Sequence, residues 1–244
     1  MFCRHGDGGL RMIIVQFDHH YFNWAHLMLR SLALHETRDP VLADTVNLSL
    51  DQVQELRQIS LHLTIDNLTI PEGVISKAFM ANRKAFVMQK AMDRFPDEPR
   101  YGLFDADLLI RSPLDDLWSY LDTHPTALFV TNGMWQGRFY LRLVTPSGIV
   151  LVRPDGRELI DIWAKWFMHD QPIEAIKPRE WFWDQVTLAM ARQESQLPIQ
   201  PIPMHIFANA DLFPEAAIWS AHVLQKEDYY VRFQQEYERQ RQTQ

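Results

Sequence analysis

Short apolar runs alternate with segments of helical spacing through the first half of the chain. The run MIIVQF at residues 12–17 is apolar and rich in β-branched side chains, which predicts a buried strand. Residues 23–35 carry apolar side chains at every third or fourth position, which predicts a helix. The same criteria predict strands at residues 44–50 and 61–68, and helices at residues 50–59, with Asp51 as N-cap, and 75–95. This alternation implies a mainly parallel sheet covered by helices on both faces.

The second half of the chain is less regular. Short strands are predicted in the segments TALFVTNG, LRLVTPSG and GIVLVRP. Amphipathic helices are predicted at residues 156–170 and 183–193, and a further helix after Ser112, with Pro113 at its first position. The polar, Gln-rich segment at residues 228–244 predicts a frayed helix or a mobile tail.

Composition and charge narrow the class of protein. Of 244 residues, 47% are hydrophobic and 23% are charged, which is typical of a globular domain. The formal net charge of -7 repels phosphate backbones, so no nucleic-acid partner is expected. The single cysteine, Cys3, excludes an internal disulfide and a cysteine-cluster metal site. No stretch approaches the roughly 20 apolar residues of a transmembrane helix, and residues 1–10 lack the apolar core of a signal peptide, so a cytoplasmic protein is expected.

Two aspartates interrupt an apolar run in the segment YGLFDADLLIRSP at residues 101–113. On an extended strand Asp105 and Asp107 would point to the same side, about 6–7 Å apart. Two carboxylates on one side of a buried strand repel each other and lose hydration. This arrangement is costly unless a cation lies between them. Oxygen ligands favour Mg²⁺ or Mn²⁺ for that role. The simpler alternative is that both aspartates end a strand and begin a turn, where Asp is common.

The longer segment YGLFDADLLIRSPLDDLW resembles the Asp-x-Asp segment of GT-A-type glycosyltransferases. Its surroundings resemble their glycogenin and lipopolysaccharide galactosyltransferase-like branch, family 8. Other parts are similar to that family in the same order: the opening strand with the SLALHE helix, SGIVLVRP, WDQVTLAMA and HVLQK. The resemblance covers residues 12–226 and implies an α/β GT-A fold, with a mainly parallel mixed central sheet flanked by helices.

The resemblance also implies how the chain is organised. We expect a flexible N-terminus at residues 1–11, a single glycosyltransferase domain at residues 12–228 and a tail at residues 229–244. Within the domain, residues 12–112 would form the nucleotide-binding half and residues 113–228 the acceptor-binding half. Peripheral association with the inner membrane face is an alternative location, although the tail is mixed in charge rather than basic.

In that family the two aspartates hold Mn²⁺ or Mg²⁺ against the diphosphate of a nucleotide-sugar. By resemblance Asp107 binds the metal directly, Asp105 shares it and reaches the ribose, and His222 supplies the third ligand. An imidazole in the ligand set favours Mn²⁺ over Mg²⁺. Lys226 would place a cation on the same diphosphate. The alternative for His222 is a surface or capping histidine, since the chain has 10 histidines.

Two further roles follow from the resemblance. Lys84 is expected to contact phosphate or the donor sugar, with Lys77 and Lys90 as competing candidates and a solvated helix face as the alternative. Asp184, followed by Gln185, is expected to take part in the transfer or to orient the acceptor hydroxyl. Otherwise Asp184 is an acid favoured by the helix dipole.

The loop after the first strand is where the family holds the nucleotide base. Asp18 and Tyr21 are the expected contacts there, while His19 and His20 could serve equally or cap the loop. The chain departs from the family at Pro146, which stands in place of an Asn before Ser-Gly. Because proline has no amide donor, a usual contact to the donor sugar is in doubt.

Together these features predict a metal-dependent glycosyltransferase that uses a nucleotide-diphosphate sugar, by resemblance a UDP-sugar. The acceptor hydroxyl would belong to a carbohydrate, a lipid-linked molecule or a protein, in cell-surface glycan synthesis, and the family implies retention at the anomeric carbon. The alternatives are a non-catalytic nucleotide-sugar binding module and an Asp-x-Asp phosphatase of the haloacid dehalogenase type. The phosphatase is disfavoured because its Asp-x-Asp opens the domain and precedes Gly-Thr or similar, whereas Leu108 and Leu109 follow here.

Overall fold

The computed structural model of the chain describes residues 10–36, 38–75, 77–130, 145–173, 177–178, 180, 182–221 and 225–243, and of Lys77 only the backbone. His222, the expected third metal ligand, lies outside the described residues. The first half of the segment LRLVTPSG, where a strand was expected, lies outside them as well.

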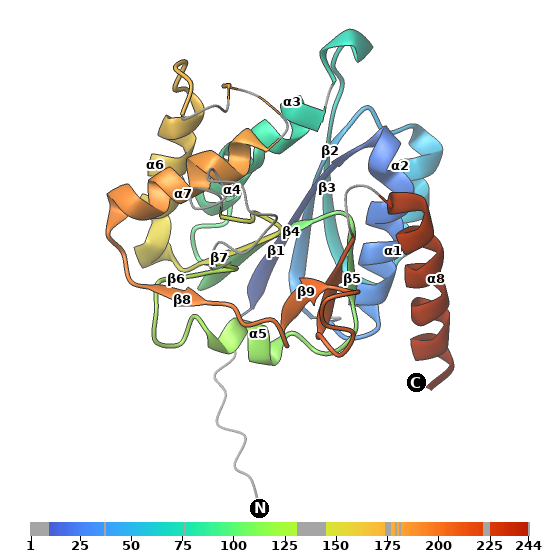
Figure 1. The fold of residues 1–244 in the computed structure, drawn as a ribbon. Helices are drawn as coiled ribbons and strands as arrows, with labels where there is room; N and C mark the ends of the chain where they lie inside the picture. Colours follow the sequence, from blue (N-terminus) through green and yellow to red (C-terminus); the bar gives the residue numbers. More distant parts are fainter. Residues whose placement is uncertain are drawn as a thin grey trace, which may run out of the picture.

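Within the described residues, a central sheet of seven strands has the order β3–β2–β1–β4–β7–β6–β8 (Figure 1). Its strands are β1 Arg11–Asp18, β2 Pro40–Val46, β3 His62–Leu68, β4 Arg100–Asp105, β6 Thr126–Leu128, β7 Ile149–Val152 and β8 Ile199–Pro201. β1 is parallel to β2 and β4, β2 to β3, and β6 to β8, whereas β7 is antiparallel to β4 and β6. The predicted mainly parallel mixed sheet is therefore confirmed.

A smaller sheet of the described part joins segments from both halves of the sequence. Its order is β5–β10–β9, made of β5 Leu108–Ile110, β9 Phe207–Asn209 and β10 Ile218–Ser220. β5 follows the aspartate pair directly, so this sheet attaches the end of the chain to the strand that carries the candidate site.

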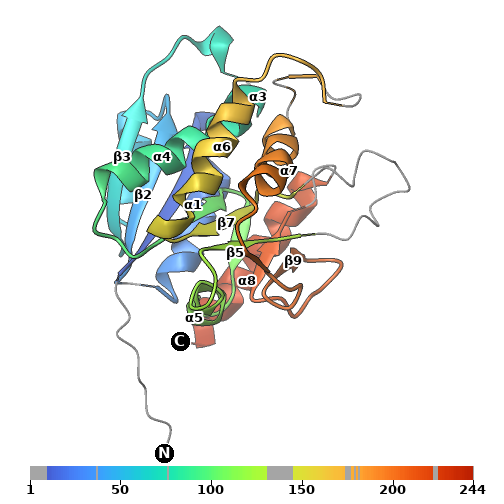
Figure 2. The ribbon, with the colours of Figure 1, turned by 90° about the vertical axis from the view of Figure 1, so that its left-hand side faces the viewer.

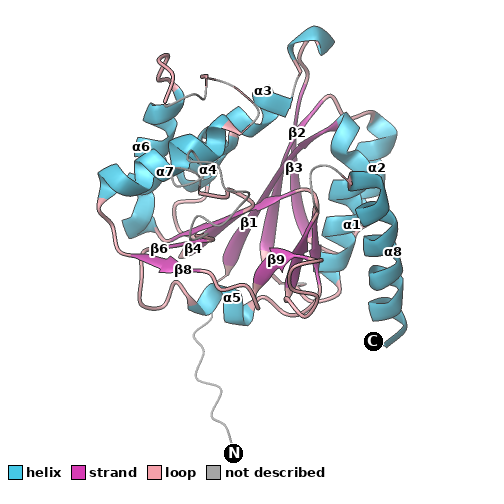
Figure 3. Cartoon of the chain, viewed as in Figure 1, coloured by secondary structure: helices cyan, strands magenta, loops and turns pink. Residues whose placement is uncertain are grey.

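Helices cover both faces of the central sheet, as Figure 3 shows. One face is covered by α3 Lys77–Asn82, α4 Lys84–Arg94, α6 Arg157–Phe167 and α7 Trp183–Ser195. Figure 2 views this face, with α4, α6 and α7 side by side. The other face is covered by α1 Phe22–Ala33 and α2 Leu50–Arg57, with α8 Lys226–Thr243 beside α1. Shorter elements are α5 Asp115–Ser119 and the 3-10 helices η1 His19–Tyr21, η2 Glu72–Val74 and η4 Pro154–Gly156.

Alternate residues of β1 belong to two separate hydrophobic cores. Ile13 and Val15 pack with residues of α1 and α2 on one face, whereas Met12 and Ile14 pack with residues of α4 and α6 on the other. Successive strand residues point to opposite faces, so a continuous apolar run is what a strand with two covered faces requires. None of the helices in the described ranges combines the length and apolar character needed to cross a membrane.

The start of α2 differs from the expectation. Its N-cap is Ser49 rather than Asp51, because the Ser49 side chain accepts a hydrogen bond from the backbone N–H of Gln52. The Gln52 side chain accepts one from the Ser49 backbone in return, which completes a capping box.

Two other helices also differ. The single helix expected at residues 75–95 is two helices, α3 and α4, separated at Arg83, whose guanidinium pairs with Asp44 at 2.7 Å. The helix expected to begin after Ser112 begins only at Asp115, and the backbone N–H of Leu114 donates instead to Glu36 at 2.8 Å.

Elements at both ends of the described chain extend into segments that were expected to be a terminus or a tail. Arg11, assigned to a flexible N-terminus, begins β1, and its guanidinium pairs with Asp39 at 2.7 Å. The expected frayed helix or mobile tail is the packed helix α8, where Tyr229, Phe233 and Tyr237 are buried. Their spacing of four residues places all three on one side of the helix, which supplies the apolar stripe that docking requires.

Candidate functional site

The two parallel strands β1 and β4 end side by side at one edge of the sheet. Gln16 on β1 stands in register with Asp105, the last residue of β4, and β1 itself ends two residues later at Asp18. The loops that follow both strands therefore share this edge. In open α/β sheets, ligands bind beyond the carboxyl ends of the strands, so this edge is where a site is expected.

The aspartate pair spans the end of β4 rather than one extended strand. Ala106 and Asp107 form a turn between β4 and β5, so the expected placement of both carboxylates on one extended strand is wrong. The turn alternative considered for these residues describes the backbone correctly. In this turn the two carboxylates have different partners, since Asp105 pairs with Lys84 and Asp107 pairs with Lys226.

Lys84 contacts three side chains, one of which is Asp105. Its Nζ lies 2.7 Å from Asp105 Oδ1, 3.0 Å from Asp184 Oδ2 and 2.9 Å from Ser147 Oγ. The Ser147 hydroxyl in turn donates to Asp184 Oδ2 at 2.5 Å. We refer to Lys84, Asp105, Ser147 and Asp184 as the Lys84 cluster.

Burial and charge act in opposite directions on the ionisable groups of the Lys84 cluster. Burial lowers the pKa of Lys84, but the carboxylates of Asp105 and Asp184 outweigh it and hold that pKa above its usual value. Burial raises the pKa of Asp105; the Lys84 ammonium opposes the rise and the Asp107 carboxylate adds to it. Strongly perturbed groups of this kind gather at functional sites more often than elsewhere.

Of the two competing lysines, Lys90 pairs with residues outside this cluster. Lys90 Nζ pairs with Asp44 at 3.1 Å and Asp66 at 2.9 Å, on β2 and β3. The side chain of Lys77 lies outside the described residues. Of the candidates whose side chains the structure describes, Lys84 is the one that contacts the aspartates.

Asp184 lies in the first turn of α7 and is almost fully buried. Lys84 and Ser147 contact its Oδ2, while its Oδ1 is buried with no hydrogen-bond partner among the described residues. A buried carboxylate oxygen is costly to leave unpaired, so we expect a water or a ligand group to donate a hydrogen bond to it. The backbone carbonyl of Gln185, the next residue, accepts a hydrogen bond from the Thr145 N–H at 3.1 Å.

Ser147 was missed as a site residue in the sequence, although the Ser-Gly pair was recognised as the start of a strand. The next residue, Gly148, allows close packing at this point. A Cβ on Gly148 would lie 2.9 Å from Phe207 Cζ and 3.6 Å from Asp105 Oδ2, and the Gly148 carbonyl accepts from the Asp105 N–H at 2.9 Å. Absence of a side chain here lets the backbone approach the end of β4.

Lys226 occupies the second aspartate position. Its Nζ lies 2.7 Å from Asp107 Oδ2 and 2.8 Å from the Tyr21 hydroxyl, and 4.3 Å from the centre of the Tyr21 ring. Burial lowers the pKa of Lys226, but the Asp107 carboxylate outweighs it and raises that pKa above its usual value. The start of α8 thus meets the loop after β1, and Lys226, Asp107 and Tyr21 lie together.

Asp18 holds the loop that carries Tyr21. Its side chain accepts hydrogen bonds from the backbone N–H groups of His20, at 3.0 Å, and Tyr21, at 3.1 Å. The carboxylate is nearly fully buried and acts as the N-cap of η1. In this structure Asp18 positions Tyr21, and a direct contact of Asp18 with a nucleotide stays a prediction.

Asp105 and Asp107 also fit the metal ion that the resemblance implies. Carboxylate oxygens suit Mn²⁺ and Mg²⁺, and each aspartate contacts its lysine through one oxygen, Oδ1 of Asp105 and Oδ2 of Asp107. Burial is the main cause of the raised pKa of Asp105, and repulsion by the Asp107 carboxylate adds to it. A cation would relieve this repulsion.

No protein-family model matches the chain, and no curated protein matches it. Similar solved structures include the glycosyltransferase GlyE of Streptococcus pneumoniae TIGR4, with a TM-score of 0.58 and 15% identity, covering 94% of this chain and 63% of GlyE. The apo form of GlyE has a TM-score of 0.55 and 14% identity, covering 95% of this chain and 63% of GlyE. A glycosyltransferase involved in the glycosylation of the major capsid of PBCV-1 gives a TM-score of 0.57 and 12% identity, covering 92% of this chain and 99% of that one.

These similarities bear on the architecture. This chain spans less than two thirds of the length of GlyE, whereas it matches nearly the whole PBCV-1 protein. At such low identity the likeness concerns the fold alone. Combined with the strand order described above, it shows that the chain has the GT-A-like α/β fold expected from the sequence.

Proposed function

We propose that the chain is a metal-dependent glycosyltransferase that moves a sugar from a nucleotide-diphosphate sugar to an acceptor hydroxyl. The observation that carries the proposal is the Lys84 cluster, which brings Asp105 and Asp184 onto one ammonium group at the carboxyl end of β4. Its position matches the edge where open α/β sheets bind ligands. Solved structures with a similar fold are glycosyltransferases, which supports the same class of reaction.

The donor end of the site would be formed by Asp105, Asp107 and Lys226. The two aspartates, with His222 as the expected third ligand, would hold Mn²⁺ or Mg²⁺. When bound, such a metal supplies Lewis-acid stabilisation of the charge that develops on the leaving diphosphate. Lys226 adds a fixed positive charge beside it, and Tyr21 offers a ring next to that ammonium for the nucleotide.

The transfer end of the site would be formed by Asp184. Lys84 and Ser147 hold its Oδ2, so the carboxylate is fixed in orientation and its Oδ1 is available to accept a hydrogen bond from the acceptor hydroxyl. Preorganisation of this kind reduces the cost of aligning the reacting groups. Gln185 is proposed as a neighbouring contact of the same substrate.

Donor and acceptor classes follow from the resemblance. A UDP-sugar is the proposed donor, with retention at the anomeric carbon. The acceptor is a hydroxyl of a carbohydrate, a lipid-linked molecule or a protein.

The experiment is a screen of nucleotide-sugars for Mn²⁺-dependent hydrolysis or transfer, followed by assignment of the product anomer by NMR. Asp107→Asn is expected to lower turnover by at least ~100-fold, because it removes a carboxylate from the metal and the diphosphate. Asp116→Asn, an exposed aspartate on α5, is the matched control and should keep full turnover. Metal-dependent binding without turnover would support the binding-module alternative, and normal turnover by Asp107→Asn would contradict the proposed site.

A further inference from the structure

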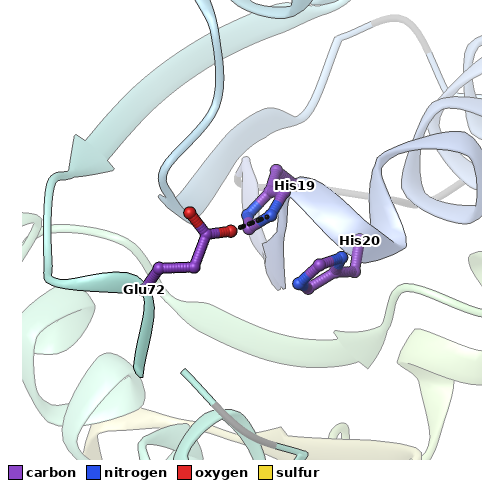
Figure 4. A group of neighbouring side chains, drawn as sticks. All are labelled: His19, His20 and Glu72. Atoms are coloured by element: carbon purple, nitrogen blue, oxygen red, sulfur yellow. Dashed lines mark ion pairs between the residues drawn. The ribbon is translucent and has the colours of Figure 1, made fainter. Parts of the chain in front are cut away.

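Three potential metal ligands outside the Lys84 cluster and the two aspartate positions come together from separate loops. His19 and His20 belong to η1, after β1, and Glu72 begins η2, after β3. One ligand atom from each of the three lies within 4.8 Å of the others. Figure 4 shows the Glu72 carboxylate facing the His19 ring, with the His20 ring beside it.

The geometry of these side chains is close to that of a coordination site. His19 Nε2 lies 3.1 Å from Glu72 Oε1, and the His19 and His20 ring centres are 3.8 Å apart. Ligand atoms that share one small metal ion lie a few ångströms apart, since each is about 2.0–2.2 Å from the ion. Small side-chain rotations would therefore bring all three onto one ion.

Both loops are held in place by hydrogen bonds that do not involve the three ligands' side chains. On one side, Asp18 caps η1 by accepting from the backbone N–H of His20. On the other, the Asn47 side chain donates to the Ile70 carbonyl and accepts from the Ile70 N–H, both at 2.8 Å, which anchors the chain just before η2. A site whose backbone is already fixed loses less entropy when the ion binds.

The donor set indicates the class of metal. Two imidazoles and one carboxylate suit Zn²⁺ and related late transition metals, in contrast to the oxygen ligands of Asp105 and Asp107. Glu72 and His20 are exposed, so an ion has access from solvent. His19 Nδ1 is a buried nitrogen with no hydrogen-bond partner among the described residues, so Nε2, the nitrogen that faces Glu72, is the candidate ligand atom of that ring.

We propose that His19, His20 and Glu72 bind one Zn²⁺-class divalent ion, separate from the metal of the transferase site. Three protein ligands leave the fourth position of a tetrahedral ion for water. The ion would link η1 to η2 and so tie the loop that carries Tyr21 to the loop after β3. The site does not depend on the proposed transferase activity.

The test measures Zn²⁺ binding by the full-length chain in a Cys3→Ser, Asp107→Asn background, which removes the thiol and weakens the other metal position. We expect this parent to bind one Zn²⁺ by isothermal titration. Co²⁺ in its place should give the visible absorption of a nitrogen- and oxygen-ligated ion.

Adding His20→Ala or Glu72→Gln to that background should lower the Zn²⁺ affinity at least ~10-fold, because even outer-shell changes cost 10–100-fold. Both positions are exposed, so these variants should keep the parent's circular dichroism spectrum. His62→Ala, an exposed histidine on β3, is the matched control and should bind Zn²⁺ like the parent. Unchanged affinity in both ligand variants, or no binding by the parent, would overturn the site and leave His19 and Glu72 as an ion pair only.

Because the readout is binding in a background without Asp107, failure of the transferase proposal would leave this result unaffected. Likewise, loss of Zn²⁺ binding in the ligand variants says nothing about turnover by the unmodified chain.

Discussion

Lys84 on α4 and Asp184 on α7 form a buried ion pair, with Nζ 3.0 Å from Oδ2. The pair joins two helices on the same face of the sheet and is shared with Asp105 at the end of β4. Buried ion pairs contribute little net stability because both charges lose hydration, so this pair is better explained by a role in the site. Each partner also depends on the other, since removing one leaves a buried charge uncompensated.

Replacement of Lys84 tests this dependence directly. Lys84→Met should leave the Asp105 and Asp184 carboxylates facing each other without a cation and lower the free energy of unfolding by about 3–5 kcal/mol. Turnover should fall to background at the same time. Urea denaturation and a donor-hydrolysis assay measure the two effects, and Lys165→Met, an exposed lysine on α6, is the control. Normal stability and turnover in Lys84→Met would show that the cluster is unimportant.

Ser147 should matter through the same cluster. Ser147→Ala removes the hydroxyl that donates to Asp184 Oδ2 and accepts from Lys84, at a cost of about 1–3 kcal/mol in unfolding free energy. We expect kcat to fall more than KM changes, because the orientation of Asp184 is affected rather than donor binding. Ser119→Ala, an exposed serine on α5, serves as comparison. A variant with unchanged kcat would argue against a positioning role for Ser147.

Lys226 should act on donor affinity. Lys226→Met removes the cation beside Asp107 and Tyr21, and we expect it to weaken UDP binding about tenfold, as loss of one charge-assisted contact does. Raising the salt concentration should weaken binding to the unmodified chain more than to the variant. Titration calorimetry measures both. Arg241→Met, an exposed cation near the end of α8, should bind UDP normally. Equal affinities in Lys226→Met and the unmodified chain would remove Lys226 from the donor site.

We expect Glu236 to make the stability of the protein depend on pH. Burial raises the pKa of Glu236, but hydrogen bonds from Arg239, Gln240 and Arg111 outweigh it and lower that pKa from 4.5 to about 2. Because the folded-state pKa is below the unfolded one, ionised Glu236 stabilises the fold above pH 4.5 and loses this effect as the pH falls toward 2.

Glu236→Gln should therefore be less stable than the unmodified chain at pH 7, by about 1–3 kcal/mol. The difference should shrink between pH 4.5 and 2. Urea denaturation across this range measures it, and Glu238→Gln, a more exposed neighbour, is the control. A difference that stays constant with pH would contradict the assigned cause.

Local periodicity in the sequence was sufficient to predict several parts of this fold. The apolar run of β1 specifies a strand with two covered faces, because its alternate residues Ile13 and Ile14 enter different cores. The order of strands and helices also follows from local sequence patterns, and it was sufficient to predict the fold class. The Asp-x-Asp segment also marked the carboxyl end of β4, since the end of an apolar run is visible in the sequence.

Which side chains meet at the end of β4 depends on contacts between segments that are distant in the sequence. The sequence left Lys77 and Lys90 as competitors of Lys84, because all three stand on the same predicted helix. Packing of the chain against β4 separates Lys84 from Lys90. Ser147 reaches the cluster for the same reason, through a contact between segments far apart in the chain. Helix α8 was mistaken for a frayed helix or tail because its three buried aromatic residues are separated by polar ones. Their burial depends on a docking surface that only the folded chain provides.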